Sequence, residues 1–169
     1  TVADPLTTPC DRSADPTPTI VLECEALLVQ IHRLVAADVA IFFEHDLANN
    51  CLTAKHLCGE PGNSLLGLQI TIGERLSGWV AANRRAAINS DASLDLGSAA
   101  RNGALALKYS LCLPVATSAH VVGVISLYSA KPFSNRDESE VAKRIADIIR
   151  FAYSEATQLD SPHSLRIAG

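Results

Sequence analysis

The sequence predicts an α+β domain built around an antiparallel sheet of five or six strands, with a long helix at each end. Two observations lead to this prediction. Short runs of alternating apolar residues follow one another between residues 38 and 129, which is typical of antiparallel strands. Apolar residues at helical spacing flank them, in residues 20–35 and 141–159. We therefore expect both terminal helices on one face of the sheet, with a short helix and an irregular loop on the other.

Composition limits the possible classes of function. The chain has 169 residues, of which 48% are hydrophobic and 19% charged, as in one soluble globular domain. A net charge of -4 argues against a nucleic-acid surface, because phosphate binding needs clustered Lys and Arg. No apolar run is long enough for a membrane helix. The sequence contains no methionine, so we expect a segment of a longer protein. We assign residues 1–17 to a linker or arm, 18–159 to the domain and 160–169 to a linker tail.

The cysteines indicate a reducing compartment. Their number is odd and they include no Cys-x-x-Cys pair, so they do not form a recognisable disulfide framework. We expect reduced thiols in a cytoplasmic protein. The five are Cys10, Cys24, Cys51, Cys58 and Cys112.

The first half of the domain is expected to be a helix followed by short strands. Alternation predicts strands at residues 38–45, 51–58, 68–72 and 86–89. The turn between the first two contains asparagines, which tolerate left-handed backbone. Between the last two strands, Leu76, Trp79 and Val80 share one side of a short helix. We therefore expect Trp79 to be mostly buried.

The second half contains the clearest hairpin. Its strands are residues 110–117 and 121–129, and alternation places Leu111 and Leu113 on one face and Cys112 on the other. Residues 90–108, which precede it, are irregular, as functional or mobile loops usually are. A capping box, either Ser134 with Asp137 or Asn135 with Glu138, begins the last helix.

Four motifs in this region, in this order, resemble those of the GAF domain, a small sensor module of signalling proteins. They are G-x-x-x-x-G-W-V at residues 73–80, S-x-x-x-P-V at 110–115, V-V-G-V-I-S-L-Y-S at 121–129 and F-x-x-x-D-E at 133–138. The resemblance implies a non-enzymatic sensory or regulatory domain of a larger signal-transduction protein. Such a domain binds a small molecule or relays a signal through dimerised terminal helices. Its output domain would be a diguanylate cyclase, a histidine kinase or a transcription activator.

The family's pocket lies between the sheet and the region around residues 79–109. The resemblance therefore makes seven residues candidates for lining it: Trp79, Asn89, Asp91, Asp95, Lys108, Tyr109 and Cys112. Three residues of the last motif are expected to be structural: Phe133, Asp137 and Glu138. The lysine that pairs with the aspartate in cyclic-nucleotide-binding relatives is displaced here to Lys131, so we expect a structural contact between Lys131 and Asp137. Arg75 stands where the family often has glycine.

No cofactor is identified, and neither a haem nor a bilin signal stands out. A metal site is not expected, because alternation places Cys51 opposite to His56 and Cys58 on a strand. Two alternatives to a sensor remain open. One is a ligand-free dimerisation spacer. The other is a redox enzyme resembling the free methionine sulfoxide reductases, which would use Cys112 together with Cys51 or Cys58.

The terminal helices are expected to form a homodimer. Their apolar stripes extend beyond what one sheet face can cover, and a two-fold dimer is the commonest way to bury such stripes. Residues expected near the seam of the resulting four-helix bundle are Ile145, Ile148, Ala152 and Leu159.

Overall fold

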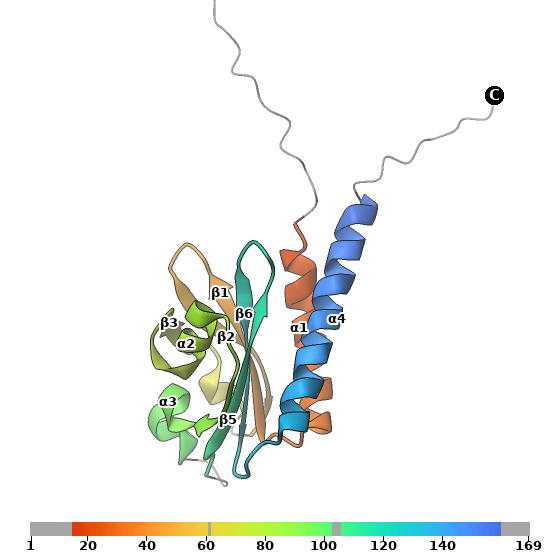
Figure 1. The fold of residues 1–169 in the computed structure, drawn as a ribbon. Coiled ribbons are helices and arrows are strands. Elements are labelled where there is room, and N and C mark those ends of the chain that lie inside the picture. The colour runs from red at the N-terminus through yellow and green to blue at the C-terminus, as the bar shows by residue number, and fades with distance from the viewer. Residues whose placement is uncertain (1–14, 61, 103–105, 160–169) are drawn as a thin grey trace, which may run out of the picture.

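A computed structural model describes residues 15–60, 62–102 and 106–159. Within them lie a six-stranded antiparallel sheet and four α-helices (Figure 1). The helices are α1 (Thr17–Leu34), α2 (Arg75–Asn83), α3 (Ser93–Leu96) and α4 (Asn135–Leu159), with 3-10 turns η1 (Gly62–Leu65) and η2 (Gly97–Ala100). The strands are β1 (Val39–Asp46), β2 (Cys51–Gly59), β3 (Gln69–Thr71), β4 (Ala87–Asp91), β5 (Tyr109–Ala116) and β6 (Val121–Ser129). The predicted α+β class is confirmed.

The strand order is β3-β2-β1-β6-β5-β4, so the first and last hairpins meet at the centre of the sheet. Helices α1 and α4 cover one face, and α2 with α3 covers the other (Figure 1). Most of the predicted arm, with Cys10, and the tail at residues 160–169 lie outside the described residues.

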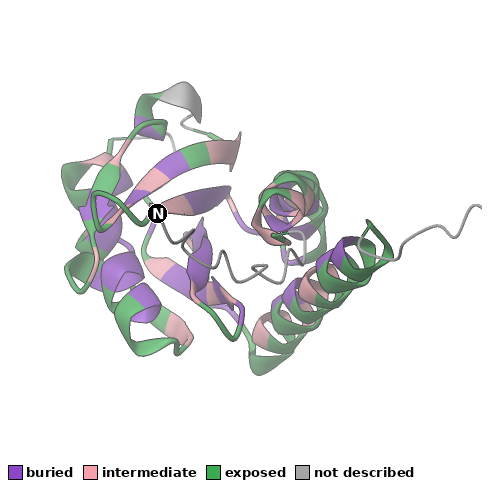
Figure 2. Ribbon diagram, turned by 90° about the horizontal axis from the view of Figure 1, so that it is seen from above, coloured by how far each residue is buried: buried purple, intermediate pink, exposed green. Residues whose placement is uncertain are grey.

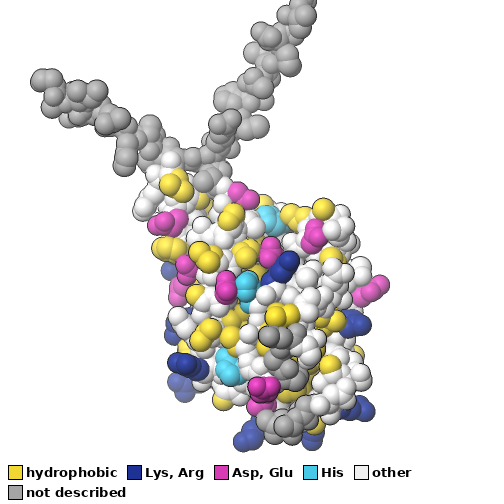
Figure 3. Space-filling view, turned by 180° about the vertical axis from the view of Figure 1, so that it is seen from behind, with side chains coloured by type: hydrophobic (Ala, Val, Ile, Leu, Met, Phe, Trp, Pro, Cys, Tyr) yellow, Lys and Arg dark blue, Asp and Glu magenta, His cyan; other side chains and the backbone are white. Residues whose placement is uncertain are grey.

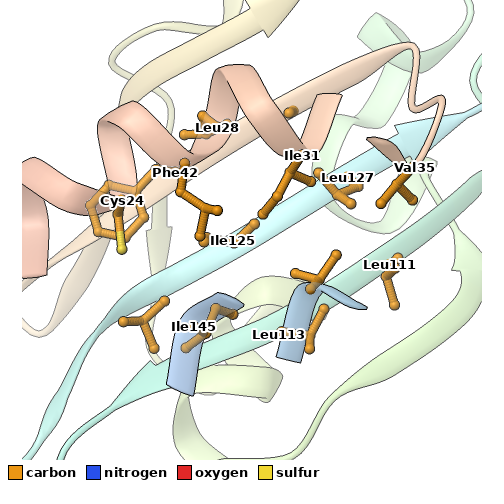
Figure 4. Packing of buried hydrophobic residues seen from close by; sticks show 14 of the residues in the cluster. Cys24, Leu28, Ile31, Val35, Phe42, Leu111, Leu113, Ile125, Leu127 and Ile145 are labelled. Carbon is orange, nitrogen blue, oxygen red and sulfur yellow. The ribbon is translucent and has the colours of Figure 1, made fainter. Parts of the chain in front are cut away.

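The sheet separates two apolar clusters. The helix-pair cluster lies under α1 and α4. Its members include Cys24, Leu28, Ile31, Phe42, Leu111, Leu113, Ile125, Leu127 and Ile145 (Figure 4). The α2-side cluster lies under α2 and α3. Its members include Phe43, Leu52, Val80, Leu96, Cys112 and Tyr128. The alternation predicted for residues 110–117 is therefore confirmed. Alternate side chains of the last hairpin therefore point into different apolar clusters.

Close backbone packing explains two glycines of the motifs. A Cβ at Gly78 would lie 2.4 Å from the Thr71 carbonyl oxygen, so glycine lets α2 rest directly on β3. A Cβ at Gly123 would lie 2.2 Å from the Phe43 carbonyl oxygen, where β6 passes β1. Both positions are steric requirements of the fold.

The first turn of α4 forms the first of the two predicted capping boxes. Ser134 donates its N–H to Asp137 Oδ2 at 2.7 Å, and Asp137 donates its N–H to Ser134 Oγ at 3.2 Å. The expected contact with Lys131 is wrong: among the described residues, Asp137 forms no ion pair with that lysine. The carboxylate is instead used by the cap.

Candidate functional site

A fully buried polar network lies between the sheet and the α2–α3 layer. Its side chains come from α2, α3, β5 and β6, and each has an exposed fraction of 0%. Its members are Ser77, Asp95, Cys112, Ser126 and Tyr128. Polar groups this deeply buried are stable only if they are hydrogen-bonded. The stability of the network therefore depends on the hydrogen bonds among these five side chains.

The Asp95 carboxylate is the centre of the network. Ser77 donates its backbone N–H to Oδ1 at 2.8 Å and its hydroxyl to Oδ2 at 2.6 Å. Tyr128 donates its hydroxyl to Oδ2 at 2.8 Å. Because the Ser77 hydroxyl proton points to Asp95, the Ser126 hydroxyl, 2.8 Å from Ser77 Oγ, is the donor in that pair. One carboxylate thus accepts three hydrogen bonds from nitrogen and oxygen donors.

The surroundings of Asp95 supply hydrogen-bond donors to its carboxylate. Ser77 is the third residue of α2, where the helix dipole and unpaired N–H groups attract anions. The pKa of Tyr128 is raised well above its usual value by burial and then by the Asp95 charge, so its hydroxyl stays protonated and able to donate. The donors around Asp95 therefore suit a carboxylate.

Arg75 ties the backbone of α3 to α2. Its Nη1 donates to the Asp95 carbonyl oxygen at 2.7 Å. The residue has φ of 52°, in the left-handed region that favours glycine, which accords with the glycine usual at this motif position. A non-glycine residue is strained in this conformation.

Cys112 lies beside the carboxylate but is not activated by it. Its Sγ is 3.9 Å from Asp95 Oδ2 and 3.9 Å from Ser77 Oγ. Burial, followed by the Asp95 charge, raises the pKa of the thiol to about 12. At neutral pH it is a protonated, inaccessible thiol, whereas a nucleophilic cysteine needs the thiolate.

The sequence model of the GAF domain family matches residues 24–154. The chain belongs to the GAF domain family. No match was found among curated proteins. None of the helices in the described part of the chain is both long enough and apolar enough to span a membrane.

Solved structures share the fold of this GAF domain at low identity. The GAF domain of an Acinetobacter phosphoenolpyruvate-protein phosphotransferase is 20% identical, with TM-score 0.62 and coverage of 86% of this chain and 94% of that one. The second GAF domain of DevS from Mycobacterium smegmatis is 16% identical, with TM-score 0.63 and coverage of 86% and 98%. The free methionine-R-sulfoxide reductase of Neisseria meningitidis is 14% identical, with TM-score 0.63 and coverage of 87% and 84%.

Of the seven candidate lining residues in this GAF domain, the network brings together Asp95 and Cys112. Lys108 is exposed, and Tyr109 packs against the helix-pair cluster on the opposite face of the sheet. Asp91 is exposed, and its Oδ1 accepts the N–H of Ser93 at 2.8 Å, at the start of α3.

The burial expected for Trp79 is wrong: its exposed fraction is 43%. Gly78 packs against the β3 backbone, so its side of α2 faces the sheet, and Trp79, the next residue, lies on a different side of the helix. The inward side of α2 is instead formed by Leu76, Ser77 and Val80.

Asn89 forms a bracket between the site side and α4. It lies at an irregularity in the pairing of β4 with β5 and has φ of 56°. Its Oδ1 accepts the N–H of Phe133 at 2.7 Å, and its Nδ2 donates to the Phe133 carbonyl oxygen at 2.9 Å. The side chain thus forms the pair of hydrogen bonds to the Phe133 backbone that a neighbouring strand would form. These bonds hold the segment that leads into α4.

Sequence reasoning missed Ser77, Ser126 and Tyr128 as members of the site. A signal was available for two of them. Ser126 pairs with Cys112 across the β5–β6 hairpin, and Tyr128 lies two residues further on. Alternation therefore places both side chains on the face already assigned to Cys112.

The prediction that Cys51 faces away from His56 and Cys58 is wrong. A β-bulge at Lys55 shifts the register, because Phe42 pairs with His56 whereas Phe43 pairs with Ala54. The extra residue returns Cys51 to the face of His56 and Cys58.

No group of three potential metal ligands occurs among the described residues. His56 instead stacks on Phe42 and lies 3.4 Å from Glu25. Histidine and acidic side chains are visible among hydrophobic ones on the molecule's rear face (Figure 3).

Proposed function

We propose that this GAF domain is a non-enzymatic regulatory domain of a larger signal-transduction protein, and that it acts as a homodimer through α1 and α4. The observation that carries the proposal is the arrangement of these two helices. They lie side by side on one face of the sheet, and their outward surfaces are exposed (Figure 2). Both therefore offer an interface while remaining attached to the core that holds the network.

The outward surface of the helix pair exposes several large apolar side chains among charged ones. Exposed fractions are 64% for Leu22, 48% for Val29, 48% for Phe151 and 78% for Leu159. A surface groove of about 240 Å³ lies between the helices, with Leu27, Ile148 and Phe151 among its lining residues. Glu23, Arg144 and Asp147 also line this groove, so it offers both apolar and charged contacts to a second copy of the chain.

Two residues expected at the dimer seam are used inside the domain. Ile145 and Ala152 have exposed fractions of 5% and 0% and belong to the helix-pair cluster. Ile148 is partly buried against the same cluster. These residues therefore hold α4 on its own domain. The dimer contact we propose is formed instead by Phe151 and Leu159 together with the exposed residues of α1.

The position of the thiols supports a non-enzymatic role. Cys112 is on the α2 side of the sheet, whereas Cys58 packs on the helix-pair side and the strand register places Cys51 on that same side, so Cys112 cannot form a disulfide with either. This arrangement argues against the redox alternative. The four described cysteines are free, which supports a reducing compartment such as the cytoplasm.

The ligand-free spacer remains a second candidate. It is favoured by one observation: the space where the family's pocket would lie is filled by the buried network. A sensor would require part of that network to move.

Sedimentation velocity across the micromolar range tests the dimer. We expect a concentration-dependent dimer, which Phe151→Asp dissociates because it places a charge in the groove between the helices. Tyr153→Asp is the matched control, since Tyr153 is an exposed aromatic residue of the same helix that does not line the groove. A monomer throughout, or equal effects of the two variants, would overturn the proposal.

A further inference from the structure

The donors that bind Asp95 belong to the rigid frame of the domain. Ser77 is held in α2, whose backbone rests on β3, and Tyr128 belongs to β6, a strand buried along its whole length. Ser126, also in β6, supports the site indirectly by donating to the Ser77 hydroxyl. We call these three residues the cradle. A carboxylate is already bound in it, by the three hydrogen bonds described above, so its chemistry as a carboxylate site is visible in the structure.

The residue that supplies the carboxylate belongs to a much weaker element. α3 has four residues and continues into the four-residue turn η2. One helical turn is not stable by itself, so tertiary contacts must hold it. Those contacts are Asp95 in the cradle, the Arg75 hydrogen bond, the buried side chains of Ala92, Leu96 and Ala100, and a backbone hydrogen bond at each end. Ala92 donates its N–H to the Lys108 carbonyl oxygen at 3.1 Å, and Leu107 donates its N–H to the Ala100 carbonyl oxygen at 2.8 Å.

The choice of an aspartate here needs a reason beyond stability. Apolar side chains surround the network, and burying a carboxylate costs solvation even when it is hydrogen-bonded, so an apolar residue at this position could pack more simply. An aspartate instead provides an interaction that another carboxylate can replace group for group. The strained backbone of Arg75, which clamps the same turn, is a second feature not required by packing.

We propose that the cradle is a binding site for small-molecule carboxylates, that Asp95 occupies it as an internal ligand, and that α3 is a latch released when an external carboxylate takes the place of Asp95. This deepens the proposed regulatory function, on which its biological meaning rests, by naming the chemical class of the signal. Release would reach α4 by a short route. Asp91, at the start of α3, ends β4, and Asn89 of β4 holds Phe133 at the entry to α4.

Chemical rescue tests the carboxylate site. Asp95→Ala removes the carboxyl group and leaves the cradle donors unpaired, so we expect a lower Tm. Formate has the chemistry of the missing group. It should restore most of the decrease in Tm in a saturable manner, whereas sodium chloride at equal ionic strength should not. The matched control is Asp91→Ala, which removes an exposed carboxylate at the start of the same helix and should show no formate-specific recovery.

Displacement in the intact protein is tested by hydrogen exchange. In the wild type, acetate should raise exchange of the amides of residues 92–100 in a saturable manner. The increase should be roughly 10- to 150-fold if releasing Asp95 breaks the equivalent of one hydrogen bond to a charged group. Chloride should not have this effect. If Asp95→Ala does not fold, the hydrogen-exchange measurement on the wild type alone tests the proposal.

Absence of formate rescue in a folded Asp95→Ala, or of acetate-specific exchange in the wild type, overturns the proposal. Neither result depends on dimerisation, so failure of the dimer would be recognised separately.

Discussion

Tyr128 contributes to stability through a single polar atom. Its ring belongs to the α2-side cluster, and its hydroxyl is one of three donors to the buried Asp95 carboxylate. Tyr128→Phe keeps the ring and removes the donor. We expect the free energy of unfolding to fall by about 1.5–3 kcal/mol, the range for hydrogen bonds to charged groups. Urea unfolding measures this, with Tyr153→Phe on the exposed side of α4 as the control. Equal midpoints for Tyr128→Phe and wild type would show that the hydroxyl is unimportant.

The buried thiols predict alkaline destabilisation. Burial raises the pKa of both Cys24 and Cys112 to about 12, from an ordinary value of 9.0. Below pH 9 the thiols are protonated in both states and have no effect on the pH dependence. Between pH 9 and 12 only the unfolded chain loses these protons, so the free energy of unfolding falls as pH rises, by up to about 1.4 kcal/mol per pH unit for each thiol.

Variants separate these thiols from other groups that titrate at high pH. Cys24→Ala should make the fall between pH 9 and 10.5 shallower, as followed by urea unfolding at several pH values, even though the variant is less stable at neutral pH. Cys51→Ala, which changes a half-buried thiol, is the matched control variant. A Cys24→Ala slope equal to that of the wild type would contradict the assignment.

At the scale of elements, the Asn89 bracket joins the edge strand β4 to the segment before α4. Asn89→Gly accepts the positive φ but loses both hydrogen bonds to Phe133. We expect a loss of about 1–2 kcal/mol in stability. Hydrogen exchange should become faster in the first turn of α4, while its last turns remain unchanged. Asn89→Ala should cost more, because alanine also resists the left-handed backbone. A first turn protected equally in Asn89→Gly and wild type would exclude the bracket.

Elements with a strong period could be predicted from the sequence, whereas irregular contacts could not. The alternation in β5 correctly separates Leu111 from Cys112 because an antiparallel strand between two cores must keep its period. The same reasoning failed in β2, where one extra residue, Lys55, reverses the phase. A bulge has little local signature, since its cause lies in the pairing with the neighbouring strand.

The candidate site was predicted less completely than the fold. Asp95 and Cys112 were identified, but the network also depends on Ser77, whose partner lies 18 residues away and in an irregular segment. The period of α2 could not place Trp79, because the orientation of this helix follows from the contact of Gly78 with the β3 backbone. Tertiary contacts of that kind override helical periodicity when a helix is only nine residues long.

At the scale of the whole molecule, the proposed site and the proposed interface lie on opposite faces of the sheet. Asp95 is under α2 and α3, whereas Phe151 lies on the outer side of α4. The described structure offers one direct side-chain connection from β4 to the start of α4, through Asn89 and Phe133. Two sites joined by a structural element can influence each other's equilibrium only if each favours a different arrangement of that element.

The last prediction is therefore a thermodynamic coupling between the cradle and the dimer. In Asp95→Ala, saturating formate should change the dimer Kd by roughly 5- to 150-fold, the usual range for coupled sites. Sedimentation equilibrium with formate or chloride measures the change. Coupling is reciprocal and each dimer has two cradles, so the formate affinity per site in the dimer and in the Phe151→Asp monomer should differ by the square root of that factor. Adding Asn89→Gly should abolish most of it, because the bracket is removed while both sites remain. A dimer Kd indifferent to formate would mean that the cradle and the helix pair act independently, even if each binds as proposed.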